Sequence, residues 1–315
     1  MHYLVTGGTG FIGAHIVRLL KEEGESPAAY DVAPNKNLLE QLMGKEADQI
    51  PVIPGDITDL EHLIHTCQEH NVERIIHTAA IIGSENPPLT VHVNCGGTIN
   101  VLEASRILGI KRVVLASSIS VYGPPDRYRE EYIPNDAPHY PQSIYAASKS
   151  FNESCAHHYF KEYGVDIISI RLAHVYGPGR LRKGIGRTID EELFIKPALG
   201  KPGRVPIGDA IHNFMYVKDA ARVMVMASTV ETTKTRAFTA DGDIVSTAQA
   251  ASCVRRFLPG AEITLLPGSA DWASKFDTKP IRDEIGYRPE WTAEQGIKDF
   301  ISEIQKLGPS MLTGA

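Results

Sequence analysis

Short apolar runs alternate with longer amphipathic segments through the first half of this chain. The longer segments repeat their apolar residues at helical spacing, whereas the short runs have the length of buried strands. Strands that alternate with helices form right-handed crossovers, so the pattern predicts a parallel sheet covered on both faces. The expected strands are 2–6, 27–31, 50–53, 73–77, 111–116 and 165–171, and the expected helices are 11–23, 59–70, 95–109 and 142–163.

The alternation loosens after Arg171. A region rich in Gly, Pro and basic residues surrounds one expected helix near 188–199, and further elements are expected at 212–229, 236–240, 247–257 and 293–306. We therefore predict an α/β chain in two parts. The doubly wound sheet takes residues 1–175 with a return segment at 212–243, and a smaller cap takes 176–211 and 244–315.

Composition narrows the class of protein. The 315 residues are 43% hydrophobic, which is ample for a sizeable core, and a net charge of −6 gives no reason to expect a nucleic acid or an acidic membrane as partner. No apolar run approaches the roughly 20 residues of a membrane helix. Four scattered cysteines without a C-x-x-C pair suit reduced thiols, and the first motif begins too early for a signal peptide, so we expect a cytoplasmic location.

The most informative motif is TGGTGFIG at residues 6–13, between the first expected strand and helix. Gly7 allows the tight turn, Gly10 lets the backbone approach a pyrophosphate, and Gly13 lets the helix pack on the strand. The helix N-terminus offers N–H donors and a positive dipole end to phosphates. The motif in this context predicts a dinucleotide site.

Polar or small residues also follow the other expected strands, where ligands of such sheets bind. Asp31 ends the second strand, at the place where a carboxylate holds a ribose hydroxyl. Asp56-Ile57 follows the third, where a carboxylate meets an adenine amino group, and Ala79-Ala80 follows the fourth, where small side chains leave room for a cofactor. Ser117-Ser118 follows the fifth strand and His174 the sixth.

Tyr145 and Lys149 lie four residues apart on an expected helix and so share one face. A tyrosine is a poor base at its ordinary pKa of about 10, and moving that pKa to about 7 needs roughly 4 kcal/mol. A nearby ammonium and a positive nicotinamide ring are the charges that would supply it. Taken alone, such a pair more often belongs to an ordinary surface helix; Ser118 and the glycine turn favour a catalytic role.

Together these motifs resemble the extended short-chain dehydrogenases/reductases of the NAD-dependent epimerase/dehydratase family. The resemblance implies a Rossmann doubly wound parallel sheet with a smaller C-terminal substrate-binding cap. The matching residues span most of the chain and are TGGTGFIG (6–13), Asp31, Asp56-Ile57, HTAA (77–80), VNCGGTINVLEA (93–104), SSISVYG (117–123), YAASK (145–149), RLAHVYGPG (171–179) and FMYVKDAA (214–221).

The resemblance also implies roles. Tyr145 would be the general acid/base, Lys149 would hold the nicotinamide ribose and lower the tyrosine pKa, Ser118 would bond the reacting oxygen, and Asn94 would support the lysine. Asp31 favours NAD over NADP, because a carboxylate repels a 2′-phosphate. The residues expected to bind NAD are Gly7, Gly10, Phe11, Ile12, Gly13, Asp31, Asp56, Ile57, Ala79, Ala80, Ser117, Tyr145, Lys149 and Ala173.

The substrate end departs from the family pattern. Members that act on nucleotide sugars carry an asparagine at His174, an arginine at His212-Asn213 and a second arginine near Gly268. Losing two cations that face a diphosphate is a large change, since charge-assisted contacts are the strong ones. We therefore doubt a nucleotide-sugar substrate. Ile119-Ser120 replaces the Asp-Glu pair of sugar 4,6-dehydratases, which argues against dehydration.

A basic loop follows the sixth strand and holds Arg180, Arg182, Lys183 and Arg187 among glycines. One hypothesis is that these cations bind a carboxylate or phosphate of a small substrate; the other is a solvated loop. The residues expected to contact substrate are Ser120, His174, Arg182 and His212. Trp272 could also line the pocket, but a position in the core is the favoured interpretation.

The remaining histidines lack the clustering of a metal site, so we expect no metal. The helices at 95–109 and 142–163 are expected to form a homodimer interface, as the resemblance implies. The function that fits best is an NAD-dependent oxidoreductase acting on a secondary alcohol or ketone, such as a sugar, sugar acid or polyol-like molecule. An epimerase with tightly bound NAD and a non-catalytic NAD(H)-sensing regulator remain as alternatives.

Overall fold

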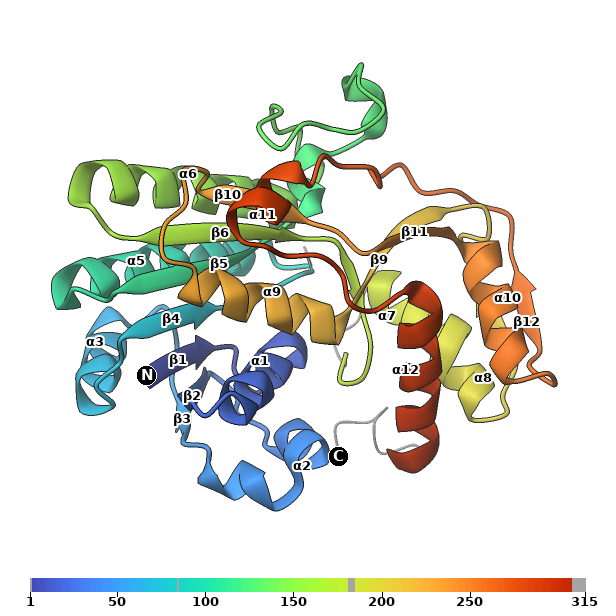
Figure 1. Ribbon diagram of the computed structural model, residues 1–315, viewed down its shortest axis with the longest axis horizontal. Helices are drawn as coiled ribbons and strands as arrows, with labels where there is room; N and C mark the ends of the chain where they lie inside the picture. The colour runs from blue at the N-terminus through green and yellow to red at the C-terminus, as the bar shows by residue number, and fades with distance from the viewer. Residues whose placement is uncertain (1, 84, 181–184, 308–315) are drawn as a thin grey trace.

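A seven-stranded parallel sheet forms the centre of the molecule (Figure 1). The computed structural model describes residues 2–83, 85–180 and 185–307. The strand order is β10-β6-β5-β4-β1-β2-β3, and every neighbouring pair is parallel. This confirms the predicted doubly wound sheet. The strands are β1 (His2–Thr6), β2 (Ser26–Asp31), β3 (Val52–Pro54), β4 (Arg74–His77), β5 (Arg112–Ser118), β6 (Ile167–Leu172) and β10 (Ala237–Ala240).

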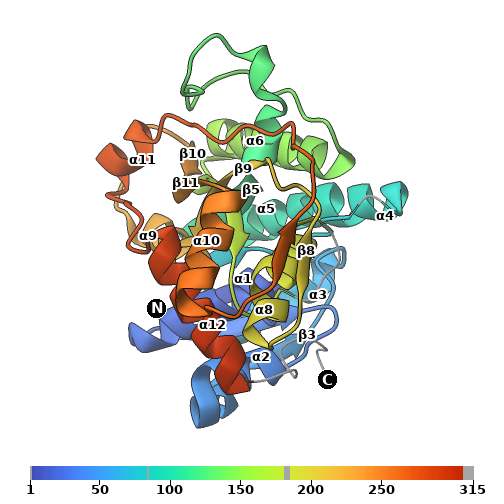
Figure 2. The same ribbon diagram turned by 90° about the vertical axis from the view of Figure 1, so that its right-hand side faces the viewer.

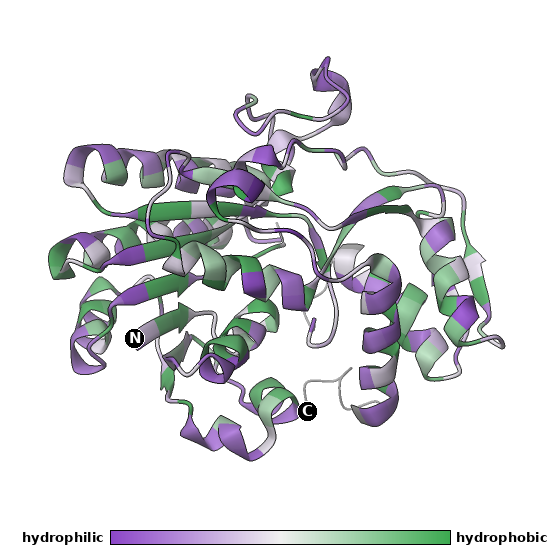
Figure 3. Cartoon of the chain, in the orientation of Figure 1, coloured by the Kyte–Doolittle hydropathy of each residue, from purple (hydrophilic) through white to green (hydrophobic). Residues whose placement is uncertain are grey.

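Helices cover both faces of this sheet (Figures 1 and 2). Helices α1 (Phe11–Glu22) and α9 (Val217–Thr229) pack together on one face, and α3 (Leu60–Glu69), α5 (Gly97–Leu108) and α6 (Ile144–Tyr163) pack side by side on the other. Successive strand residues point to opposite faces, so Leu4 and Val5 enter two separate apolar cores. Figure 3 shows the resulting apolar strands between helices with mixed surfaces.

A second, smaller sheet continues beyond the carboxyl ends of β5 and β6. It has the order β11-β9-β7, from β7 (His174–Tyr176), β9 (Ile211–Tyr216) and β11 (Asp243–Ser246). The sequence did not predict β7, because three residues directly after a buried strand give no separate pattern. The pair β8 (Gly203–Val205) and β12 (Ile263–Leu265), with α10 (Thr247–Phe257) and α12 (Ala293–Leu307), completes this end of the molecule.

The expected helix near 188–199 is three consecutive segments, α7 (Ile185–Ile189), a π-helical turn η5 (Asp190–Ile195) and α8 (Lys196–Ala198). The remaining elements are α2 (Asn37–Met43), η1 (Gly44–Gln49), α4 (Pro87–Val91), the π-helical η2 (His92–Gly96), η3 (Ile119–Tyr122), η4 (Pro125–Arg127) and α11 (Lys279–Glu284). The division into two domains stays a prediction. Among the described residues, no helix has the length and apolarity needed to cross a bilayer.

Candidate active site

The glycine turn between β1 and α1 is built by backbone packed directly on backbone. Gly7 has a φ of +69°, and its N–H donates to the Tyr30 carbonyl at 2.8 Å. A Cβ on Gly7 would lie 2.9 Å from the Ala79 nitrogen, and one on Gly13 would lie 2.0 Å from the Gly7 oxygen. The turn therefore has no room for side chains at Gly7 and Gly13, as their predicted roles require.

The N-terminus of α1 opens at this turn. Gly10 is the N-cap and no side chain caps the helix there, so the first N–H groups of Phe11 and Ile12 have no side-chain acceptor at the cap. The Gly10 N–H itself donates to Gly7 at 3.0 Å. An uncapped helix N-terminus beside a glycine cradle fits a pyrophosphate.

Asp31 lies at the edge of the same turn. Its Oδ2 accepts from the Thr9 hydroxyl at 2.9 Å and from the Thr9 N–H at 3.3 Å. The carboxylate is thus held at the end of β2, where a ribose would lie. The sequence reading missed Thr9, although a hydroxyl inside the glycine motif was a usable signal.

The other expected cofactor contacts line the next strand ends. Asp56 Oδ1 accepts from the Thr58 N–H at 2.8 Å. Ile57 is buried and packs directly against Gly97, where an added Cβ would lie 2.5 Å from the isoleucine side chain. Ala79 and Ala80 follow β4 beside the glycine turn. Their contacts with NAD stay predictions.

The structure brings Ser118, Tyr145 and Lys149 together at the carboxyl end of β5. Ser143 caps α6 by accepting from the Ala146 N–H at 3.1 Å, which places Tyr145 in the first turn. Lys149 Nζ lies 5.6 Å from the centroid of the Tyr145 ring, and it donates to the Ala116 carbonyl at 2.7 Å. The Ser118 hydroxyl lies near enough to Tyr145 to lower the pKa of the tyrosine.

Burial dominates the electrostatics of this cluster. It raises the pKa of Tyr145, while the Ser118 hydrogen bond and the positive charge of Arg180 act to lower that pKa. Burial also lowers the pKa of Lys149 to about 8. The chain by itself therefore does not lower the Tyr145 pKa as expected, because desolvation outweighs the nearby charges.

Asn94 connects the catalytic helix to the neighbouring loop. It lies in the π-helical segment η2, where its side chain exchanges two hydrogen bonds with Ile81, at 2.8 and 2.9 Å, and donates to Ser148 at 3.1 Å. Ser148 is adjacent to Lys149 in α6. The predicted supporting role of Asn94 stays a prediction, and this contact is the route by which it would act.

His77, which the sequence analysis quoted in the HTAA motif without giving it a role, is buried and supports the same region. His77 lies between the hydroxyls of Thr6, at 2.6 Å, and Thr98, at 3.0 Å. Because the Thr98 hydroxyl already donates to the Asn94 carbonyl at 2.7 Å, His77 Nε2 must donate and Nδ1 must accept. Burial lowers the pKa of His77 to about 3, so the ring is neutral and links Thr6 of β1 to Thr98 of α5.

Ser117 points away from Ser118, as successive strand residues do. Its hydroxyl bonds the carboxylate of Glu153, which also pairs with Arg171 at 2.7 Å. Its predicted contact with NAD stays a prediction, as does that of Ala173, which is buried between β6 and β7.

His174 and His212 lie together on neighbouring strands of the small sheet. Their ring centroids are 5.3 Å apart, and both rings contact Phe214 and Trp272. Burial lowers the pKa of His212 to about 4 and that of His174 well below its ordinary value, so both rings are neutral at pH 7. The Nε2 of His174 and the Nδ1 of His212 are buried and have no hydrogen-bond partner among the described residues.

The other substrate candidates differ in how much the structure says of them. Ser120 lies beside the catalytic cluster and donates its hydroxyl to Ser118 at 2.9 Å. Arg182 and Lys183 lie outside the described residues. Arg180 Nε lies 3.1 Å from the carboxylate of Asp190, a fully buried residue that the sequence reading did not single out. The acidic run directly after the basic loop was the available signal.

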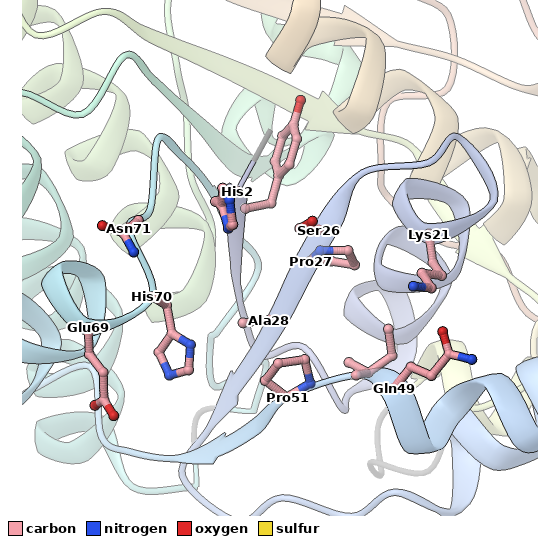
Figure 4. A pocket seen from close by; sticks show the side chains of 12 residues that line it. His2, Lys21, Ser26, Pro27, Ala28, Gln49, Pro51, Glu69, His70 and Asn71 are labelled. Carbon is pink, nitrogen blue, oxygen red and sulfur yellow. The ribbon is translucent and has the colours of Figure 1, made fainter.

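The cavity in Figure 4 lies at the opposite end of the sheet. It has a volume of about 390 Å³ and is lined by residues at the amino ends of the strands, among them His2, Ser26 and Asn71. None of the predicted site residues lines it. Within the described ranges, no three His, Cys, Asp or Glu side chains gather as metal ligands would.

Comparison with known proteins supports the same family throughout. The family model of the NAD dependent epimerase/dehydratase family matches residues 3–239. A UDP-glucuronate 4-epimerase of Thermodesulfobacterium geofontis is 34% identical, covering 70% of this chain and 69% of its own length. The solved UDP-glucose 4-epimerase of Thermus thermophilus in complex with NAD is 25% identical with a TM-score of 0.80, covering 97% of this chain and 99% of its own. A partial-consensus L-threonine 3-dehydrogenase shares the fold with a TM-score of 0.86 at 22% identity, covering 97% of this chain and all of its own.

The glycine cradle, the uncapped helix N-terminus and Asp31 fit the dinucleotide that this family uses. The chain therefore belongs to the NAD-dependent epimerase/dehydratase family of enzymes, with a Rossmann-fold sheet and NAD as its cofactor.

Proposed function

We propose that this enzyme transfers a hydride reversibly between a secondary alcohol and NAD, with Tyr145 as the acid/base. The observation that supports the proposal is the convergence of Ser118, Tyr145 and Lys149 at the carboxyl end of β5, in the same parallel sheet whose strand β1 leads into the glycine turn. When bound, NAD supplies the acceptor for the hydride. Tyr145 Oη takes the proton of the substrate hydroxyl, and the Ser118 hydroxyl bonds the reacting oxygen.

Lys149 has two tasks in this proposal. Its Nζ already bonds the Ala116 carbonyl, so it is fixed at the end of β5 and can hold a ribose hydroxyl with its other protons. Its positive charge favours the ionised form of Tyr145, against the burial that raises that pKa. Because the pKa of Lys149 is only about 8, the side chain loses its proton and its positive charge in alkaline solution.

We further propose that the substrate is not a nucleotide sugar. His212, at the place of an expected arginine, is fully buried and bonded to Thr247 at 2.9 Å. Gly268, at the place of the other, donates its N–H to the carboxylate of Asp209 at 3.0 Å. A carboxylate in that position repels a diphosphate, so a small sugar, sugar acid or polyol-like molecule fits the site better. The basic loop with Arg182 favours an anionic one.

A turnover screen tests the proposal. Wild-type protein with NAD is given sugars, sugar acids, hydroxy acids and hydroxy ketones, and the formation or consumption of NADH is followed. We expect turnover with at least one small alcohol, and a loss of about 10² to 10⁴ in kcat for Tyr145→Phe, the usual contribution of a general acid/base. Full activity in the Tyr145→Phe variant would exclude the assigned role.

An epimerase is the second candidate, because the 34% identical relative is named a UDP-glucuronate 4-epimerase. Such an enzyme keeps NAD bound and shows no net turnover of added cofactor. The amount of NAD that stays with the purified protein separates the two. The third candidate, a non-catalytic NAD(H)-sensing regulator, requires that Tyr145→Phe keeps the full biological activity.

We also propose a homodimer through α5 and α6. Ile107, Phe151 and Tyr163 on these helices are 50%, 43% and 54% exposed, which is high for large apolar side chains. Light scattering measures the mass directly. A Phe151→Glu variant should shift the protein toward 34.5 kDa, the mass of one chain.

The four cysteines are free, which fits the expected cytoplasmic location.

A further inference from the structure

Helix α6 is joined to the large sheet by an ion pair one helical turn beyond Lys149. The side chains of Glu153 on α6 and Arg171 on β6 are only 8% and 6% exposed. Arg171 Nη2 donates to Glu153 Oε2 at 2.7 Å, and Arg171 Nε donates to the two carboxylate oxygens at 3.0 and 3.1 Å. The Ser117 hydroxyl donates to the same carboxylate. The planar guanidinium thus holds the Glu153 side chain in one orientation.

Arg171 also bonds the segment that follows Ser118. Its Nη1 donates to the Tyr122 hydroxyl at 2.7 Å and to the Asn135 carbonyl at 2.6 Å. Tyr122 is the last residue of η3, which begins directly after Ser118, and its hydroxyl bonds Thr239 of β10 at 2.8 Å. One buried guanidinium therefore joins α6, β6, β10 and the turn after Ser118.

The ion pair acts on the same face of α6 as the proposed catalytic side chains. Tyr145, Lys149 and Glu153 follow one another at four-residue spacing, and Glu153 lies about 6 Å beyond Lys149 along the helix axis. Two consecutive residues of β5 receive these side chains. Lys149 Nζ donates to the Ala116 carbonyl at 2.7 Å, and the Ser117 hydroxyl donates to Glu153. The two contacts together fix the position of α6 along β5.

Stability alone does not account for a charge at Arg171. Strand β6 is buried along its whole length, and an apolar residue at this place would continue its pattern. Apolar replacements of a buried ion pair are often as stable as the pair, because they avoid the cost of desolvating two charges. What the pair adds is direction, since its hydrogen bonds weaken as soon as either element shifts. Reacting groups need that precision, because a misplacement of about 1 Å costs about 10²-fold in rate.

We propose that Glu153 and Arg171 are positioning residues whose buried pair sets the place of α6 along β5 and thereby aligns Tyr145 and Lys149 with Ser118. The inference rests on the proposed function and extends it to two residues that touch neither substrate nor cofactor. They act through the helix that carries Tyr145 and Lys149 and through the turn that follows Ser118.

Glu153→Asp tests position separately from charge, because it keeps the carboxylate and shortens the side chain by one methylene. Arg171 then loses its bonds or draws α6 out of place. With the alcohol found in the turnover screen, we expect kcat to fall about 10²-fold, while KM and the affinity for NAD stay near their wild-type values. Glu162→Asp makes the same change at an exposed position of α6 and should keep wild-type kinetics.

A double variant and crystal structures complete the experiment. Glu153→Met with Arg171→Met leaves no lone buried charge and removes the directional bonds, so it should lose kcat to a similar extent. In NAD-bound crystals of Glu153→Asp and of the double variant, we expect Tyr145 and Lys149 to lie about 1 Å from their wild-type places relative to Ser118. Superposition of these three side chains on wild type in both variants overturns the inference, and so does wild-type kcat in both. The crystals need no turnover, so the inference can fail while the role of Tyr145, tested by the activity of Tyr145→Phe, stands.

Discussion

Two regions of this enzyme are built by different means: the glycine turn with its neighbouring strand ends, called here the cofactor half, and the small sheet with the predicted substrate residues, called the substrate half. Around the glycine turn, backbone contacts backbone, Thr9 donates to Asp31, and His77 bonds the hydroxyls of Thr6 and Thr98. Around the small sheet, buried polar atoms of His174 and Asp190 have no hydrogen-bond partner among the described residues. Backbone packed on backbone preforms the cofactor turn, whereas the unpaired buried groups near the small sheet mark a place where a ligand or water could complete the site.

The largest expected effect breaks the preformed half. Gly13→Ala places a Cβ 2.0 Å from the Gly7 oxygen, and neither backbone can move without opening the turn. We expect the affinity for NAD to fall at least about 100-fold, since backbone overpacking costs a few kcal/mol. Calorimetry of NAD binding measures the change. Gly260→Ala is the matched control, because a Cβ there meets nothing within 4 Å; equal losses in both variants would contradict the account.

Two buried groups, His77 in the cofactor half and Asp190 near the small sheet, give the stability opposite dependences on pH. His77, with a pKa of about 3 in the folded protein, binds its proton only after unfolding, so its contribution to stability is lost as the pH falls below about 6.5. Asp190, with a raised pKa of about 7, holds a proton in the folded state, so its contribution is lost as the pH rises from about 4 through 7. The two effects oppose each other between pH 7 and pH 5.

Asp190→Asn removes one of the two opposing effects. The variant should lose more free energy of unfolding between pH 7 and pH 5 than wild type, by about 2 kcal/mol, which is 1.36 kcal/mol for each pH unit that a single group titrates. Urea unfolding at the two pH values gives the difference. Equal slopes in wild type and variant would show that Asp190 is ionised throughout.

A smaller effect is expected at the ribose end. Asp31→Asn keeps the shape of the side chain and removes its charge, so we expect the affinity for NAD to fall about tenfold and that for NADP to fall less or to rise. Binding of both cofactors to the same preparation is the measurement. A variant that keeps the full preference for NAD would remove Asp31 from the account of selectivity.

The smallest expected effect concerns the basic loop. Arg182→Ala should raise KM for an anionic substrate several-fold and leave kcat near its wild-type value, as expected for a contact made equally in the ground state and the transition state. Lys201→Ala, which removes one positive charge from an exposed position elsewhere, is the control for a general effect of charge on KM. An unchanged KM in the Arg182→Ala variant would show that Arg182 does not bind the substrate and would favour the solvated loop.

The sequence predicted the cofactor half well because its determinants are local. Every strand of the large sheet begins and ends within a few residues of its predicted bounds, and the motif at residues 6–13 folds as the expected turn. Apolar periodicity and glycine spacing each act over a few residues. The helix that carries Tyr145 and Lys149 was predictable for the same reason.

The rest of the site depends on contacts between distant segments. His77 meets Thr98 across 21 residues, and Arg180 meets Asp190 across the basic loop. The strand β7 exists because β9, about 40 residues later, pairs with it. No local pattern encodes such pairings, so the sequence showed that His174 and His212 depart from the family but not that their rings lie 5.3 Å apart.

The most direct test of the contrast between the two halves is calorimetric titration of the wild-type protein with NAD and then, at saturating NAD, with UDP. We predict that NAD binds and that millimolar UDP gives no heat of binding, because in the proposed function Gly268 and His212 replace the arginines expected to hold a diphosphate. Micromolar binding of UDP to the NAD-loaded protein would contradict the account and return the enzyme to the nucleotide-sugar substrates of its relatives.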